Sequence, residues 1–137
     1  MNWTLEVVVV PVSDVDRAKA FYAGQLGFAV DHDSNFGDQL RVVQLTPRGS
    51  GCSVVIGRGI SEMAPGSLHG RQLVVNDLRA ARAELVGRGV DVGEIEVVGD
   101  GSMPEEGDLK GLDNVGFVYF ADPDGNRWGV QQISARS

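Results

Sequence analysis

Residues 12–22, which read VSDVDRAKAFY, decide the fold, because an apolar run ends there and a pattern of helical period begins. The same transition recurs 63 residues later, where VNDL at positions 75–78 again closes an apolar run. Aligning the two stretches pairs Ala18 with Ala81 at the same place in each helical pattern. The chain is therefore expected to contain two copies of one structural unit.

Each copy carries residues that are typical of a helix start. Ser13 is the expected N-cap of the first helix, and Asp16, three residues further on, would complete a capping box. Asp14 and Asp16 also favour the positive end of the helix dipole. Asn76 is the expected N-cap of the second helix.

Short β-prone runs follow each helix and are separated by turn residues. The expected strands after the helices are 28–30, 41–46 and 53–56 in the first half and 90–92, 116–120 and 128–133 in the second. Each half therefore reads βαβββ. The sequence DPDGN at 122–126 predicts a hairpin turn before the last strand, because proline presets one turn angle and Gly or Asn accepts a positive φ.

The length of 137 residues suits one domain, residues 1–137, built from two modules. The first module is expected at about 1–57, a linker with proline and several glycines at 58–67, and the second module at about 68–135. Residues 99–113 are rich in Gly and acidic side chains, which predicts either a lid or a surface excursion.

Composition excludes several classes of function. The chain has 12 Lys and Arg against 19 Asp and Glu, a net charge of -7, which argues against nucleic acid as a partner. The single cysteine, Cys52, cannot form an internal disulfide or a cysteine-rich metal site. Neither a membrane span nor a signal peptide is evident, so a cytoplasmic location without membrane contact is expected.

Two βαβββ halves, the pattern V-x-D-[VL]-x-x-A opening each helix, and D-P-D-G-N before the last strand resemble the vicinal oxygen chelate superfamily. That superfamily includes glyoxalase I, extradiol dioxygenases, and fosfomycin- and bleomycin-resistance proteins. The resemblance implies an α+β fold in which two βαβββ modules form a half-open β-barrel cleft. It also implies four positions at which metal-dependent members place His, Gln or Glu.

Those four positions hold few donors in this sequence. Counting from the matched motifs places them at Val7, Gln44, Gly70 and Gly129, and His69 lies beside Gly70. A one-residue shift in a strand turns a side chain to the opposite face, so His69 would need a bulge to take part. A divalent metal needs several convergent donors. The sequence thus predicts no metal site and no cofactor.

Strand alternation assigns further side chains to the same cleft faces as these positions. The predicted surface mixes apolar walls with neutral amides, and two glycines leave room for a ligand. The expected ligand-binding residues are Val7, Val9, Gln44, Gly70, Gln72, Gly129 and Gln131. If the sheets are open to solvent instead, the glutamines are simply exposed strand positions.

Candidates for catalysis are few. His32 stands between two aspartates and is a weak candidate base, although a solvated strand end is the favoured explanation. Cys52 has no recognisable activating partner. Trp128, Phe21 and Tyr22 are expected in the core, Trp128 because alternation points it away from the cleft.

The favoured function is metal-independent binding of a small, often cationic organic molecule, similar to sequestration by bleomycin-resistance proteins. The resemblance implies a homodimer, with the apolar Val8 and Val10 compatible with its interface; whether modules pair within or between chains stays open. One alternative is a cofactor-free isomerase, lyase or cyclase acting on a secondary metabolite, with His32 or the acidic loop moving a proton. Another is a metal-dependent glyoxalase or dioxygenase that uses Gln44, His69 and His32 in an unusual register.

Overall fold

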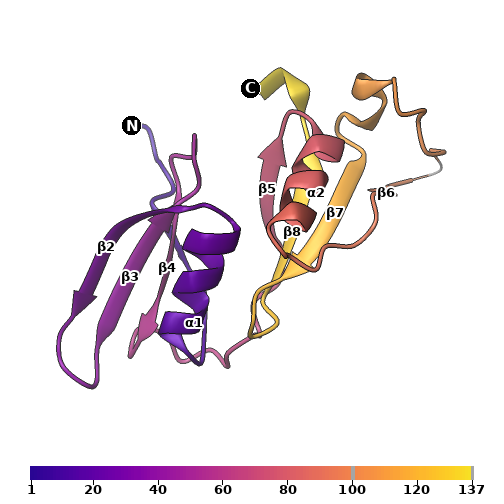
Figure 1. The fold of residues 1–137 in the computed structure, drawn as a ribbon. Coiled ribbons are helices and arrows are strands. Elements are labelled where there is room, and N and C mark those ends of the chain that lie inside the picture. Colours follow the sequence, from indigo (N-terminus) through magenta and orange to yellow (C-terminus); the bar gives the residue numbers. More distant parts are fainter. Residues whose placement is uncertain (100, 137) are drawn as a thin grey trace. The chain divides into compact units, whose positions relative to one another are not determined.

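The computed structural model describes residues 1–99 and 101–136, and the chain divides into two compact units (Figure 1). Unit 1 comprises residues 1–68 together with 122–126, and unit 2 comprises residues 69–121 and 127 onward. Each unit contains one four-stranded mixed sheet and one main helix. The predicted α+β class is confirmed.

Sheet A, in unit 1, has the strand order β1-β4-β3-β2. Its strands are β1 (Val7–Val9), β2 (Ala29–Asn35), β3 (Arg41–Thr46) and β4 (Ser53–Arg58). β1 runs parallel to β4, and the other pairs are antiparallel. The parallel pair requires a crossover, which the helical segment after β1 provides.

The helical segment of unit 1 is α1 (Val15–Lys19), which continues as the π-helical turns of η1 (Ala20–Gln25). Its N-cap is Asp14, whose carboxylate accepts a hydrogen bond from the Arg17 N–H at 3.1 Å. The prediction of Ser13 as the cap was wrong by one residue, because the Ser13 hydroxyl is engaged by Asp124 instead. The prediction of Phe21 and Tyr22 as core residues is confirmed, since both are buried.

α1 covers one face of sheet A, which we call the helix face. Val43, Leu45 and Ile56 on this face are fully buried. Arg41 of β3 also lies there and binds Asp16 of the helix at 2.8 Å. The opposite face of sheet A, which carries alternate residues of the same strands, has no helix of unit 1 against it.

Sheet B, in unit 2, repeats the same order as β5-β8-β7-β6. Its strands are β5 (Arg71–Val75), β6 (Glu96–Val97), β7 (Gly116–Ala121) and β8 (Arg127–Gln132). β5 pairs parallel with β8, as β1 does with β4. The predicted strand at 90–92 was wrong: Val92 makes only an isolated bridge to Phe120, and the short strand lies at β6.

Helix α2 (Leu78–Gly87) covers one face of sheet B. Asp77 caps it by accepting from the Ala80 N–H at 3.1 Å, so the expected cap Asn76 was also wrong by one residue. Gln132 of β8, fully buried, accepts from the Leu78 N–H at 2.9 Å and so ties the helix start to the sheet. None of the described helices is long and apolar enough to cross a membrane.

Unit 2 holds the described part of the acidic segment 99–113 in place. The Arg79 guanidinium donates to the Pro104 carbonyl at 2.8 Å, and η2 (Leu109–Leu112) buries Leu112 completely. Asp113 accepts hydrogen bonds from Ser134, at the start of η3 (Ser134–Arg136), and from Gln132. These bonds, from Ser134 first, lower the pKa of the Asp113 carboxyl.

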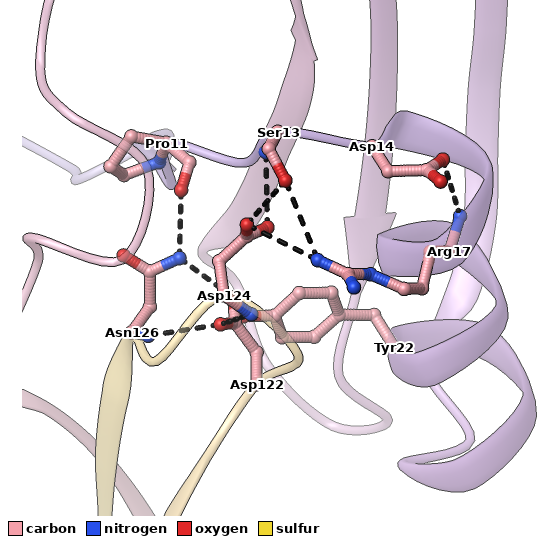
Figure 2. Close-up of polar contacts among 8 residues, drawn as sticks. All are labelled: Pro11, Ser13, Asp14, Arg17, Tyr22, Asp122, Asp124 and Asn126. Atoms are coloured by element: carbon pink, nitrogen blue, oxygen red, sulfur yellow. Dashed lines mark hydrogen bonds and ion pairs between the residues drawn. The ribbon is translucent and has the colours of Figure 1, made fainter.

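The DPDGN turn, 122–126, belongs to unit 1 although it connects β7 and β8 of sheet B. Asp122 and Asn126 are buried there, and the Tyr22 hydroxyl donates to the Asp122 carboxylate at 2.7 Å (Figure 2). The Asn126 side chain donates to the Pro11 carbonyl and to Asp122, both at 2.8 Å. This sequence therefore does more than reverse the chain, because its side chains dock the turn onto unit 1.

Asp124 supplies a second part of the same contact. Its carboxylate accepts from the Ser13 backbone at 3.0 Å and from the Ser13 hydroxyl at 2.5 Å, and it pairs with Arg17 at 3.3 Å (Figure 2). The turn thus binds the residues that open the first helix. Figure 2 shows these groups converging around the start of α1.

Candidate functional site

The face of sheet B turned away from α2 carries two aromatic rings and two amides. Cross-strand register places Phe117 opposite Gln131, Tyr119 opposite Gly129, and Gln72 beside Gly129 on one face. The Phe117 and Tyr119 rings are 6.1 Å apart and nearly parallel, at 5°. We call this surface the aromatic face of sheet B.

The two predicted glutamines of this face meet. Gln72 Nε2 donates to Gln131 Oε1 at 2.5 Å, and Gln131 Nε2 donates to the Asn114 carbonyl at 2.9 Å. These two hydrogen bonds fix the orientation of the Gln131 amide. Gln72 is an exposed residue, and its side-chain carbonyl oxygen is available on the same face.

The two predicted glycines of this face differ in the space they leave. A Cβ at Gly129 would lie 3.2 Å from Tyr119 Cε1, so the Tyr119 ring already fills the space that the missing side chain leaves. At Gly70, φ is +91° and no atom lies within 4 Å of the corresponding position. The expectation of room at both glycines holds only at Gly70.

Two arginines border the aromatic face. Arg127 lies over the Tyr119 ring at 4.6 Å, and Arg71, over the Trp128 ring at 5.3 Å, donates to the Arg127 carbonyl. A hollow of about 170 Å³ opens at this border. It is lined by residues at the start of β5, by residues at the start of β8 and by the rings of β7. These residues are Gly70, Arg71, Gln72, Phe117, Tyr119, Arg127, Trp128 and Gly129.

Sequence reasoning missed Phe117, Tyr119 and Arg127. The signal for the rings was present, because alternation in β7 places residues 117 and 119 on one face and the hairpin register sets that face beside Gly129. Trp128 is buried on the opposite face, stacked with Phe120, so the prediction of a core position is confirmed.

The face of sheet A opposite α1 carries the other predicted residues, and we call it the open face of sheet A. Register aligns Val9 with Val55 and Gln44 with Val55, so these three side chains share this face with Val7. All but Val55 are half-buried. The structure thus brings Val7, Val9 and Gln44 together on sheet A, and Gly70, Gln72, Gly129 and Gln131 together on sheet B.

Strand β2 borders the open face of sheet A and contains a β-bulge. The pairing with β3 shifts between Val30 and His32, which places His32 opposite Gln44. Asp31, the extra residue, reaches the Thr46 hydroxyl and accepts its hydrogen bond. The adjacent residues Asp31 and His32 therefore both lie on this face, whereas adjacent side chains of a regular strand point to opposite faces.

The second carboxylate of this strand, Asp33, has a structural role on the helix face. It pairs with Lys19 at 2.7 Å and with Arg41 at 3.0 Å. Hydrogen bonds from Arg41 first, and then from Lys19, hold the pKa of the Asp33 carboxyl well below its ordinary value. The same pairing raises the pKa of Arg41.

The remaining candidates lie outside both faces or lack partners for chemistry. His32 and His69 are exposed, and Cys52 is half-buried with its thiol 3.7 Å from the Ser53 carbonyl. From the sequence, Val10 is compatible with a dimer interface. In the structure it is buried on the helix side of unit 1, so it is not an exposed residue.

The four positions that the resemblance assigns to metal ligands do not fit a metal here. Val7 and Gly70 have no donor side chain, Gln44 offers one amide, and Gly129 is covered by the Tyr119 ring. Among the described residues, no three His, Cys, Asp or Glu side chains gather closely enough to hold an ion. We therefore derive no chemistry through a metal.

Solved structures similar to this chain include antibiotic-binding and resistance proteins. TnmS3, an antibiotic binding protein from Streptomyces sp. CB03234, is 34% identical, with a TM-score of 0.74 over 97% of this chain and 98% of that chain. A glyoxalase/bleomycin resistance protein from the same Streptomyces is also 34% identical, with a TM-score of 0.70 over 94% and 100% of the two chains. A superfamily member from Sphaerobacter thermophilus DSM 20745 is 26% identical, with a TM-score of 0.74 over 96% and 98%.

A search of the curated proteins found no match to the chain. The family model, in contrast, matches residues 4–130, which run from before β1 into β8 and include both helices and the docked turn. The resemblance drawn from the two helix starts is thus confirmed, and the chain belongs to the Glyoxalase/Bleomycin resistance protein/Dioxygenase superfamily.

Proposed function

We propose that the protein binds a small organic molecule with an aromatic ring system and sequesters it without a metal. The observation that carries this proposal is the aromatic face of sheet B, where two parallel rings, Phe117 and Tyr119, lie beside the linked amides of Gln72 and Gln131. Flat apolar rings with a few fixed polar groups are the usual composition of a ligand site.

Each group on this face has a defined use in binding. Phe117 offers an aromatic surface, which favours offset or edge-on contact with another ring system, and the Arg127 guanidinium lies over the neighbouring Tyr119 ring. Gln72 presents a carbonyl oxygen and Gln131 is held by Asn114, so a ligand with hydroxyl or amino groups is oriented rather than merely adsorbed. Gly70 provides the open approach, because nothing occupies the space beside it.

The hollow at the border of this face is about 170 Å³, which is below the roughly 300–1,000 Å³ typical of whole ligand sites. It therefore accommodates part of a ligand. We propose the open face of sheet A, with Val7, Val9 and Gln44, as a second ligand-binding surface, and we propose that two such chains form a homodimer.

The similar structures support binding of this kind. TnmS3, 34% identical over nearly the whole chain, is described as an antibiotic binding protein. The poor fit of Val7, Gln44, Gly70 and Gly129 to a metal agrees with binding by contact surfaces alone.

Native mass spectrometry of the purified protein, with and without added bleomycin, tests the proposal. We expect a dimer that carries an organic molecule and no stoichiometric divalent metal. Calorimetric titration with bleomycin should then show weaker binding for Gln72→Ala and Gln44→Ala, with Gln39→Ala, an exposed glutamine of a loop, as the matched control. A bound metal, or chemical conversion of the bound molecule, would contradict sequestration.

A further inference from the structure

We propose that Asp31 makes the open face of sheet A selective for organic cations, such as a protonated amine attached to an apolar body. The proposal rests on the proposed function, because it assigns ligand chemistry to one of the two faces described above. Three observations carry it: the bulge in β2, the hydrogen bonds that hold the carboxylate, and the absence of a cationic partner among the described residues.

The bulge explains why a carboxylate lies on this face. Val30 pairs with Leu45 and His32 pairs with Gln44, so Asp31 is inserted between two consecutive pairs. Its carboxylate reaches Thr46, which shares the open face with Gln44 by alternation. Bulges commonly re-aim a side chain next to functional sites, and here the re-aimed side chain is charged.

Two hydroxyls hold the Asp31 carboxylate in place. The Thr46 hydroxyl donates to Asp31, and the Thr46 and Ser53 hydroxyl oxygens are 2.6 Å apart. Ser53 is buried, so this chain of hydroxyls anchors the carboxylate to the interior of β4. A carboxylate held in this way keeps a second oxygen for a ligand.

Asp31 and Asp33 differ in their charged partners. Asp33 is neutralised by Lys19 and Arg41 on the helix face. No Lys, Arg or His of the described residues forms an ion pair with Asp31. An uncompensated negative charge on β2, next to half-buried Gln44 of the neighbouring strand β3 and on the same face as Val55 of β4, complements a cation that also carries apolar surface.

Asp31 is an exposed residue, so its expected effect on ligand affinity is modest. Exposed charge pairs contribute roughly 0.2–1 kcal/mol, which corresponds to about a 1.4- to 5-fold change in affinity. The preference should weaken as salt is raised, because the Debye length falls from about 10 Å at 0.1 M to 3 Å at 1 M.

The test compares two probes of similar size that differ in charge, 2-phenylethylammonium and 2-phenylethanol, by amide NMR titration of the full chain. The titrations are run at pH 8, where an ordinary imidazole is neutral. Asp31→Asn keeps the shape and the acceptor for Thr46 but removes the charge. Asp33→Asn is the matched control, because that carboxylate is already paired on the other face.

We expect the wild type to bind the ammonium probe about threefold more tightly than the alcohol at low salt, with shifts at Thr46 and Gln44. Asp31→Asn should bind both probes equally, and Asp33→Asn should keep the preference. If the wild type binds both probes equally, the assignment to Asp31 is wrong while the binding function stands. If neither these probes nor bleomycin bind, the proposed function itself fails.

Discussion

Asn126 offers the most direct test of how unit 1 is held together. Its side chain is fully buried and makes three hydrogen bonds: to the Pro11 carbonyl at 2.8 Å, to the Asp122 carboxylate at 2.8 Å, and from the Leu68 N–H at 3.1 Å. Asn126→Ala removes all three at once. The turn would remain covalently in place and Asp124 would still bind Ser13, but the bonds to Pro11, Asp122 and Leu68 would be lost.

The expected loss follows from these bonds. A neutral hydrogen bond contributes about 1 kcal/mol, and one to a charged group about 1.5–3 kcal/mol. The Pro11 carbonyl keeps a second donor, the Gly66 N–H at 3.2 Å, which limits the cost of desolvation. We expect Asn126→Ala to lower the free energy of unfolding by about 3 kcal/mol, a large part of the 5–15 kcal/mol typical of a domain.

Native-state hydrogen exchange is the appropriate assay, because amides in β3 and β4 report the stability of unit 1 by itself. Tyr22→Phe, which removes the bond to Asp122, should cost about 1.5–3 kcal/mol. Asn35→Ala is the matched control, since that side chain is exposed and accepts one bond from Gly37; it should change stability by less than about 0.5 kcal/mol. Equal stability of the Asn126 and Asn35 variants would refute the docking argument.

Further predictions concern two glycines and one carboxylate. Gly66→Ala should cost about 2–4 kcal/mol in urea unfolding, because φ is +80° and the new Cβ would lie 2.0 Å from the Asp124 carbonyl; an unchanged midpoint would contradict this. Gly129→Ala should displace the Tyr119 ring and shift its proton resonances at a cost of about 1 kcal/mol, whereas unshifted resonances would show that the ring is not packed there. Asp33→Asn should lower stability by a constant amount at neutral pH; because the folded-state pKa of Asp33 is depressed, this deficit should shrink below the ordinary Asp pKa of about 3.9 and vanish as pH falls through the folded-state value. A deficit that persists at acid pH would contradict the ion-pair explanation.

Much of the fold was predictable from local patterns. The repeat at 12–22 and 75–78 predicted both helices and the apolar runs that precede them, since apolar period and helix starts are properties of short segments. The N-caps were displaced by one residue in both halves. Asp14 and Asp77 take that role because Ser13 is engaged by a turn more than a hundred residues away, and because Asp77 is the last extended residue before α2.

The predicted strand at 90–92 failed for a related reason. An apolar run of three residues has no period that distinguishes a strand from a buried connection, and pairing with β7 occurs instead at β6. The site was predictable where alternation decides the face: Gln72 and Gln131 meet as their positions require.

The sequence alone determined the superfamily, the two-module plan and the scarcity of metal donors at the four expected positions, because these depend on residue identity and on spacing along the chain. Tertiary structure decided what occupies the two candidate faces. Tyr119 fills the space over Gly129, a bulge turns Asp31 onto the face that holds Gln44, and DPDGN anchors a turn to unit 1 through Asp122 and Asn126. Each of these results depends on which strand or helix lies opposite, and contacts between residues distant in sequence leave no periodic trace in the sequence itself.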